Sequence, residues 1–258
     1  MGNFHGQFLW HEYQADDPAT AVAFYRALMG WGEQAWNDDG SPYTLLTVDG
    51  HAIGGITALA DEAREAGSGP QWLGYVGVTD LEATLRQSEN LGGQVLTPPR
   101  LIEGCGRVAV VQDPQGAIFA LITPTEESNQ WEPGNSPIWW NELLATDEEA
   151  AWQFCRQLFG WDATGCMDMG EFGKYRMYGT AGTPFGGIAR QPGETPASSF
   201  WLYYFSVDDM QTALDMIHRH GGAVTGGPME LPNGDRVARC RDPQGGSFAL
   251  HALRRRGS

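Results

Sequence analysis

The stretch from Trp10 to Trp31 decides the fold of this chain, because the chain contains it twice. It reads WHEYQADDPATAVAFYRALMGW, and Trp140 to Trp161 reads WNELLATDEEAAWQFCRQLFGW, so ten of the 22 positions are identical. A second pair of stretches, Arg107 to Leu121 and Arg236 to Leu250, shares ten of 15 positions and contains Asp-Pro-Gln-Gly both times. The offset between copies, 130 and then 129 residues, is the size of one domain. We infer a tandem duplication.

Composition supports two packed domains and argues against some partners. The chain has 258 residues, 41% of them hydrophobic, with 10 Trp and 11 Phe, which is enough for two cores. Its net charge of −16 repels phosphate backbones and anionic lipid, so we expect neither a nucleic-acid nor a membrane partner. The four cysteines form no CxxC pair and do not match between the halves. A reducing cytoplasm is therefore the expected location.

The hydrophobic pattern predicts two domains of one design, residues 1–125 and 137–254, joined by a polar linker at 126–136. Each half reads as a strand, a helix and further strands, and then the same order again, which is a mixed α/β (α+β) fold. The Asp-Pro-Gln-Gly stretches predict tight turns between the last two strands of each half. We expect helices at 18–29, 81–91, 148–159 and 210–220, and first-half strands at 8–15, 43–48, 52–58, 72–78, 95–101, 107–112 and 117–122.

Four motifs in the same order in each half carry a family resemblance. The first is the end of the first helix, with Phe24-Tyr25, Leu28 and Gly30-Trp31. The others are Val207-Asp208-Asp209 before the later helix, the Gly-Gly pair after that helix, and Asp-Pro-Gln-Gly. The chain resembles the vicinal oxygen chelate superfamily of glyoxalases, bleomycin-resistance proteins and extradiol dioxygenases. Within it, the chain is similar to tandem glyoxalase-like proteins of the actinobacterial "hydroxylase" type. The resemblance implies two βαβββ modules per half, curled into a half-barrel around a pocket, and docking of the two halves on each other.

The resemblance also implies where a metal would bind. Enzymes of the family place His, Gln or Glu at four positions of each half, because divalent metals prefer imidazole and carboxylate ligands. None of the residues at these positions is a metal ligand, and the six histidines do not replace them. We therefore expect no metal and no cofactor. The positions are Trp10, Gly55, Leu73 and Ala120 in the first half and Trp140, Gly187, Leu202 and Ala249 in the second.

Repeated residues on the first strand of each half suggest a ligand. Trp and Glu two residues apart share one strand face, and an indole beside a carboxylate suits a small aromatic or polar, cationic molecule. The alternative is that Glu12 and Glu142 are core carboxylates paired with Arg107 and Arg236. The candidate ligand-binding residues are Trp10, Glu12, Tyr75 and Arg107 in the first half and Trp140, Glu142, Tyr204 and Arg236 in the second.

Three function classes follow from these residues. The first is a metal-independent protein that binds a small molecule, in order to sequester or sense it. The second is a lyase, isomerase or oxygenase (hydroxylase) that uses Glu12 or Glu142 as an acid–base group, or a metal site that the pattern does not reveal. The third is a regulatory scaffold that binds another protein.

Overall fold

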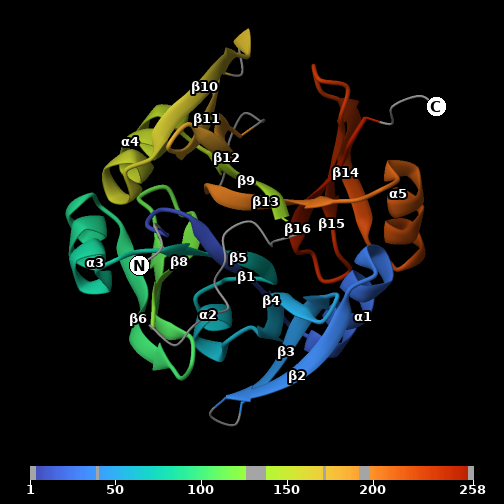
Figure 1. The fold of residues 1–258 in the computed structure, drawn as a ribbon, viewed down its shortest axis with the longest axis horizontal. Helices are drawn as coiled ribbons and strands as arrows, with labels where there is room; N and C mark the ends of the chain where they lie inside the picture. The colour runs from blue at the N-terminus through green and yellow to red at the C-terminus, as the bar shows by residue number, and fades with distance from the viewer. Residues whose placement is uncertain (1–3, 39–40, 126–137, 171–172, 192–197, 255–258) are drawn as a thin grey trace. The chain divides into compact units, whose positions relative to one another are not determined.

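The computed structural model describes residues 4–38, 41–125, 138–170, 173–191 and 198–254. The first half forms two successive modules, each of which begins with a strand and a long helix (Figure 1). Its elements are β1 (Phe8–Ala15), α1 (Pro18–Met29), β2 (Gly32–Asp38), β3 (Ser41–Val48), β4 (His51–Ala58), α2 (Asp61–Glu65), β5 (Gln71–Gly77), α3 (Leu81–Asn90), β6 (Gln94–Ile102), β7 (Gly106–Gln112) and β8 (Ile118–Pro124).

The second half repeats the order of long helices and strands. Its elements are β9 (Ile138–Ala145), α4 (Glu148–Phe159), β10 (Asp162–Asp168), β11 (Lys174–Thr180), β12 (Thr183–Arg190), β13 (Phe200–Ser206), α5 (Met210–Arg219), β14 (Ala223–Glu230), β15 (Arg236–Arg241) and β16 (Ser247–Ala252). Each half has one eight-stranded sheet, in the orders β2-β3-β4-β1-β5-β8-β7-β6 and β10-β11-β12-β9-β13-β16-β15-β14. These orders confirm the predicted mixed α/β fold with two modules in each half.

The long helices begin and end where the repeated residues predict. Asp17 caps α1 by accepting hydrogen bonds from the backbone N–H groups of Ala19 and Thr20, and Asp147 caps α4 in the same way. Gly30 and Gly160 then end these helices with φ of 70° and 69°, a conformation that favours glycine. The buried faces of α1 and α4 lie along β4 and β12, the fourth strands of their modules.

Two elements of the first half were not predicted. Strand β2 was missed because its sequence, GEQAWND, is mostly polar, as is common for a strand at the edge of a sheet. The short helix α2 buries none of its residues, so no hydrophobic pattern marks it. Strand β8 also runs to Pro124, two residues beyond its predicted end. The predicted linker, 126–136, lies outside the described residues.

Close packing divides the chain into two compact units, and each unit draws on both halves of the sequence. One unit is built around residues 73–125 and 140–202, and the other around 11–72 and 203–254. In the first unit, Phe119 of β8 packs against Phe159 of α4, with ring centroids 5.6 Å apart. In the second, Trp72 packs against Phe205 of β13, at 5.0 Å. The cores of both units are therefore aromatic.

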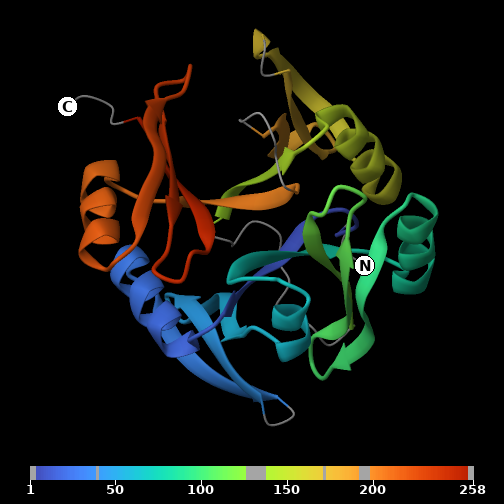
Figure 2. The same cartoon turned by 180° about the vertical axis from the view of Figure 1, so that it is seen from behind.

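Each later helix also packs on strands of its own module. Helix α3 lies along β6 and β7, and α5 lies along β14 and β16 (Figure 2). Within the described ranges, no helix is both long and apolar enough to cross a membrane.

Candidate functional site

In the second half, Glu142 lies on β9 beside a glycine of the neighbouring strand. Parallel pairing of β9 with β12 places Glu142 opposite Gly187, so the two residues share one sheet face. Only 3% of Glu142 is exposed. Helix α4 covers the opposite face, since its Glu149 binds Arg176, whose sheet partner is Ile188. The Trp-x-Glu side chains thus project from the face that α4 leaves uncovered.

A tyrosine from the next strand covers this glycine. A Cβ atom added to Gly187 would overlap the ring of Tyr175 on β11, and its three nearest atoms all belong to that side chain. Trp140 Nε1 donates a hydrogen bond to Tyr175 Oη at 2.7 Å, which ties the half-buried indole to the phenol. Met177 also lies on this face, because it pairs with Gly187 across the β11–β12 ladder. The site in this module is an aromatic surface around a buried carboxylate.

The first half has the same arrangement with different neighbours. Glu12 lies opposite Gly55 in the parallel pair of β1 and β4 and is 7% exposed. A Cβ atom on Gly55 would overlap the ring of Tyr43 on β3. Gln14, two residues along β1, donates a hydrogen bond from Nε2 to Glu12 Oε1 at 3.3 Å. Trp36 packs edge-on against Tyr43, with ring centroids 5.5 Å apart.

The residues at the family's metal positions do not fit a metal ion. At the fourth-strand position of both halves, a tyrosine ring occupies the space that a ligand side chain would need. The other positions hold Trp10, Leu73 and Ala120, or Trp140, Leu202 and Ala249, and none of these side chains donates an electron pair to a metal. The described part of the chain also contains no cluster of three or more His, Cys, Asp or Glu suited to a metal.

The other predicted site residues divide between two sheet faces. Tyr75 pairs with Ala120, and Tyr204 pairs with Ala249, so both tyrosines share a face with the final-strand metal position. Arg107 pairs with Thr123, whereas Ala120 pairs with Val110. Thr123 is three residues from Ala120, an odd number, so Arg107 lies on the opposite face of the sheet. There it forms an ion pair with Glu82 of α3, Nη1 to Oε1 at 2.5 Å.

Arg236 is also separated from the tyrosine of its own module. It pairs with Ala252 on the face opposite Ala249, and it is exposed. Arg239 instead pairs with Ala249 and lies on the same face as Tyr204. Arg239 has no counterpart in the first half, where Val110 stands at the matching position, so the sequence repeat does not point to it. The available signal in the sequence was an arginine without a counterpart within an otherwise apolar stretch of the second repeat.

Tyr43 and Tyr175 were overlooked as well. They match each other at an offset of 132 residues, whereas the helices that precede them match at 130. Two additional residues between the helix and the third strand of the second half therefore shift the copies out of register. A search at constant offset misses the pair for this reason.

Comparisons with known proteins agree with the fold and the duplication. Residues 11–122 match the glyoxalase-like domain, and residues 140–250 match the glyoxalase/bleomycin resistance protein/dioxygenase superfamily. A "putative glyoxylase CFP32" of Mycobacterium tuberculosis is 29% identical over 93% of this chain and 92% of its own length. The "anthracycline biosynthesis protein DauV" of Streptomyces sp. is 29% identical over 95% of this chain and 92% of its own.

Solved structures share the fold at low sequence identity. A Mn(II)-bound glyoxalase from Novosphingobium aromaticivorans has a TM-score of 0.63 and 16% identity, over 96% of this chain and 82% of that one. The 2,2',3-trihydroxybiphenyl 1,2-dioxygenase of Sphingomonas wittichii also has a TM-score of 0.63, with 14% identity over 95% of this chain and 89% of that one. With both halves matched, this chain belongs to the glyoxalase/bleomycin resistance protein/dioxygenase superfamily and carries a glyoxalase-like domain in each half.

Proposed function

We propose that this protein binds a small, flat molecule that carries a polar or cationic group, and that it does so without a metal. The observation that supports the proposal is the tyrosine over each fourth-strand glycine, Tyr43 over Gly55 and Tyr175 over Gly187. A metal ligand needs a side chain at this position, and the phenol ring takes its place. Each module then offers recognition groups rather than a Lewis acid.

The chemistry of these groups suits a planar ligand with a positive charge. Trp140 and Tyr175 present aromatic surface held by their hydrogen bond, and aromatic rings stack on flat molecules. Glu142 and Glu12 supply buried carboxylates that would pair with an ammonium group. Met177 and the exposed Met167 add flexible, polarisable surface on β11 and β10, which adapts to the outline of a ligand.

The names of two relatives suggest a ligand class to test. DauV and DnrV, which are 29% and 28% identical to this chain, are named as anthracycline biosynthesis proteins. Anthracyclines combine a flat polycyclic ring system with a sugar, which in daunorubicin carries an amine. The ring system matches Trp140 and Tyr175, and the ammonium group matches Glu142. We propose a ligand of this shape and charge for the second half.

Acid–base catalysis by Glu12 or Glu142 is the second candidate function. The observation that favours it is the burial of both carboxylates on an aromatic face, a setting that enzymes use for proton transfer. In this proposal, Glu142 would take a proton from a carbon or hydroxyl of the bound molecule and return it elsewhere. Product formation from a bound anthracycline, lost in Glu142→Gln while binding persists, would distinguish this function from binding alone.

We further propose that the domains at residues 1–125 and 137–254 work docked together, in the cytoplasm. A contact between helices of the two halves supports the docking, since Gln87 Nε2 of α3 donates a hydrogen bond to the carbonyl oxygen of Gln157 in α4, at 2.6 Å. The absence of a CxxC pair and of a matched cysteine between the halves supports the location.

Isothermal titration calorimetry with daunorubicin tests the proposed binding. The protein should bind it after treatment with a chelator, and Trp140→Leu should weaken binding at least tenfold. Trp139→Leu is the matched control, because successive strand residues face opposite sides of a sheet. Absence of binding by the wild-type protein, or equal losses in the two variants, would contradict the proposal.

A further inference from the structure

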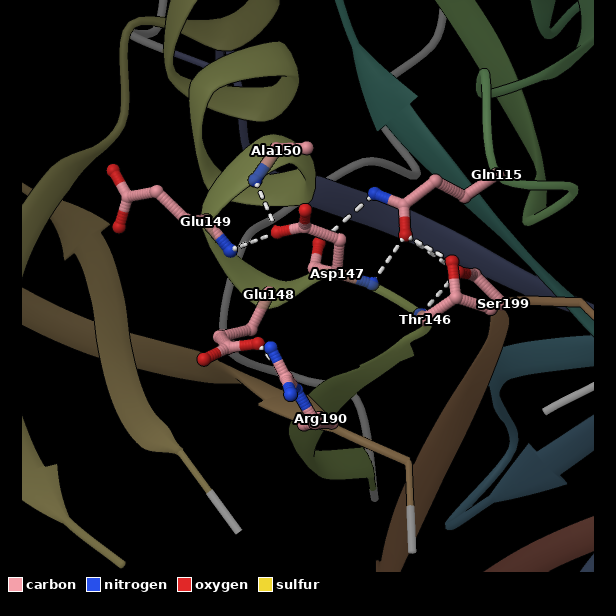
Figure 3. Close-up of polar contacts among 8 residues, drawn as sticks. All are labelled: Gln115, Thr146, Asp147, Glu148, Glu149, Ala150, Arg190 and Ser199. Atoms are coloured by element: carbon pink, nitrogen blue, oxygen red, sulfur yellow. Dashed lines mark hydrogen bonds and ion pairs between the residues drawn. The ribbon is translucent and has the colours of Figure 1, made fainter. Parts of the chain in front are cut away.

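The repeated Asp-Pro-Gln-Gly turn reaches the other half of the chain. Gln115 Oε1 accepts a hydrogen bond from the backbone N–H of Asp147 at 2.7 Å, and Gln115 Nε2 donates one to the carbonyl oxygen of Asp147 at 3.0 Å (Figure 3). Gln244 makes the same two bonds to the backbone of Asp17, at 2.7 and 3.0 Å. We call each of these two-bond contacts a glutamine clamp.

Both clamps hold the residue that begins the first helix of the opposite half. Asp147 caps α4 through its side chain, which accepts hydrogen bonds from the N–H groups of Glu149 and Ala150 (Figure 3). The N–H of such a capping residue has no partner inside the helix. The glutamine supplies that partner from the other half. One residue therefore joins a helix start to a turn that is distant in the sequence.

The clamp made by Gln115 has more support than the clamp made by Gln244. Its Oε1 also accepts hydrogen bonds from the hydroxyl groups of Thr146 and Ser199 (Figure 3). The backbone N–H of Ser199 donates to the carbonyl oxygen of Gln115 at 2.9 Å. The same turn approaches the second half so closely that a Cβ atom on Gly116 would lie 2.9 Å from Ser198 Cβ. At Gly245, the corresponding glycine, none of the described residues apart from its chain neighbours comes within 4 Å of such a Cβ atom.

The aspartate of each turn faces the same helix that the glutamine holds. In the second half, Asp242 Oδ1 accepts hydrogen bonds from backbone N–H groups of its own turn. Asp242 Oδ2 accepts a hydrogen bond from the hydroxyl group of Tyr25 in α1, at 2.9 Å. In the first half, Asp113 lies near Cys155 of α4, the residue that matches Tyr25. Burial first, and then the Asp113 carboxylate, raises the pKa of the Cys155 thiol well above its usual value.

These contacts form a reciprocal arrangement. Each half contributes one turn and one capped helix, and each turn meets the helix of the other half through two residues at the same turn positions. We propose that the Asp-Pro-Gln-Gly turn is the docking element of this chain, and that the Gln115 clamp contributes more to docking than the Gln244 clamp. The inference rests on the docking of the halves proposed above and names the residues that maintain it.

Amide hydrogen exchange in the full chain, followed by NMR at single residues, tests this role. Gln115→Ala should accelerate exchange at the Asp147 amide by roughly tenfold or more and leave the Asp17 amide unchanged, because the clamp protects one N–H. Gln244→Ala should do the reverse, with a smaller effect. The control is Gln112→Ala, since Gln112 Nε2 donates to the carbonyl oxygen of Gly116 within the same half. It should change neither amide.

The outcomes separate the clamp from docking in general. Fast exchange at both amides of the wild-type protein would overturn the docking itself. If both amides are protected in the wild-type protein but Gln115→Ala leaves their exchange rates unchanged, only the role of glutamine is overturned. The same holds if Gln115→Ala accelerates exchange equally at both amides. If Gln115→Ala does not fold, Gln115→Glu serves instead, because it keeps the acceptor oxygen and removes the donor. The Asp147 amide should then exchange at a rate between those of the wild type and an unprotected amide, with Asp17 unchanged.

Discussion

Replacing Gly187 by alanine tests whether Tyr175 closes the fourth-strand position. The new Cβ would overlap the phenol ring, so Tyr175 must move and release the hydrogen bond from Trp140 Nε1. Overpacking costs about 1–3 kcal/mol, and a lost hydrogen bond costs about 0.5–1.5 kcal/mol. We therefore expect Gly187→Ala to lower the free energy of unfolding by about 1.5–4.5 kcal/mol.

Urea unfolding measured by circular dichroism gives this value, and a double-mutant cycle assigns it to the pair. Tyr175→Ala removes both the overlap and the hydrogen bond, so the double-mutant cycle should show a coupling energy close to the full cost, about 1.5–4.5 kcal/mol. Gly69→Ala is the control, because a Cβ atom there would meet no described residue within 4 Å beyond its chain neighbours, and the backbone φ is not positive. The reasoning is refuted if Gly187→Ala is as stable as the wild type, or if Tyr175→Ala leaves its cost unchanged.

Three further predictions concern the carboxylates and the docking of the halves. If Glu12 and Glu142 bind ligands, Glu→Gln at either position should weaken daunorubicin binding by about 1.5–3 kcal/mol and leave the melting temperature nearly unchanged. If the carboxylate is instead structural, the same substitution should lower the free energy of unfolding by about 3–5 kcal/mol. Burial raises the pKa of Asp113, so the folded state holds this proton more tightly than the unfolded chain, and stability falls as pH rises through the folded pKa. In thermal melts from pH 4 to 7, the melting temperature of Asp113→Asn should therefore decrease less with rising pH than that of the wild type. An unchanged pH profile would contradict the role given to Asp113. Residues 1–125 alone should be poorly soluble, because Phe119 would no longer be covered by Phe159 of α4. A monomeric fragment that unfolds cooperatively and binds ligand as tightly as the full chain would count against docking.

The sequence predicts the fold well because the fold depends on local signals that occur twice. Asp17 and Gly30 mark the two ends of α1, and Asp147 and Gly160 mark the ends of α4. Each signal acts within one helical turn, so it can be recognised without knowledge of the tertiary structure. Strand β2 lacks such a signal, since its polar residues do not alternate with apolar ones.

The candidate site was only partly predictable. Position on the first strand places Trp140 and Glu142 on one face, as alternation requires. The face of Arg107 depends on how β7 pairs with β8, and no repeat in the sequence specifies that pairing. Tyr175 reaches Gly187 through the ladder of β11 and β12, which the sequence leaves equally undetermined.

The glutamine clamps show a different limit. Pro and Gly explain why Asp-Pro-Gln-Gly turns, and Asp113 Oδ1 accepts N–H groups of its own turn as a turn residue should. The glutamine has no such local task. Its partner is 32 residues away at Asp147, and in the second half 227 residues away at Asp17. Its repetition was visible, but its purpose depends on tertiary contact.

Metal content measured by mass spectrometry on the purified protein, before and after incubation with Mn²⁺, Ni²⁺, Zn²⁺ or Fe²⁺, tests the central claim most directly. We predict much less than one bound ion per chain, together with no rise in melting temperature, because a ligand that binds only the folded state would stabilise it. One tightly held ion per domain, whose removal by a chelator abolishes ligand binding or activity, would contradict the claim.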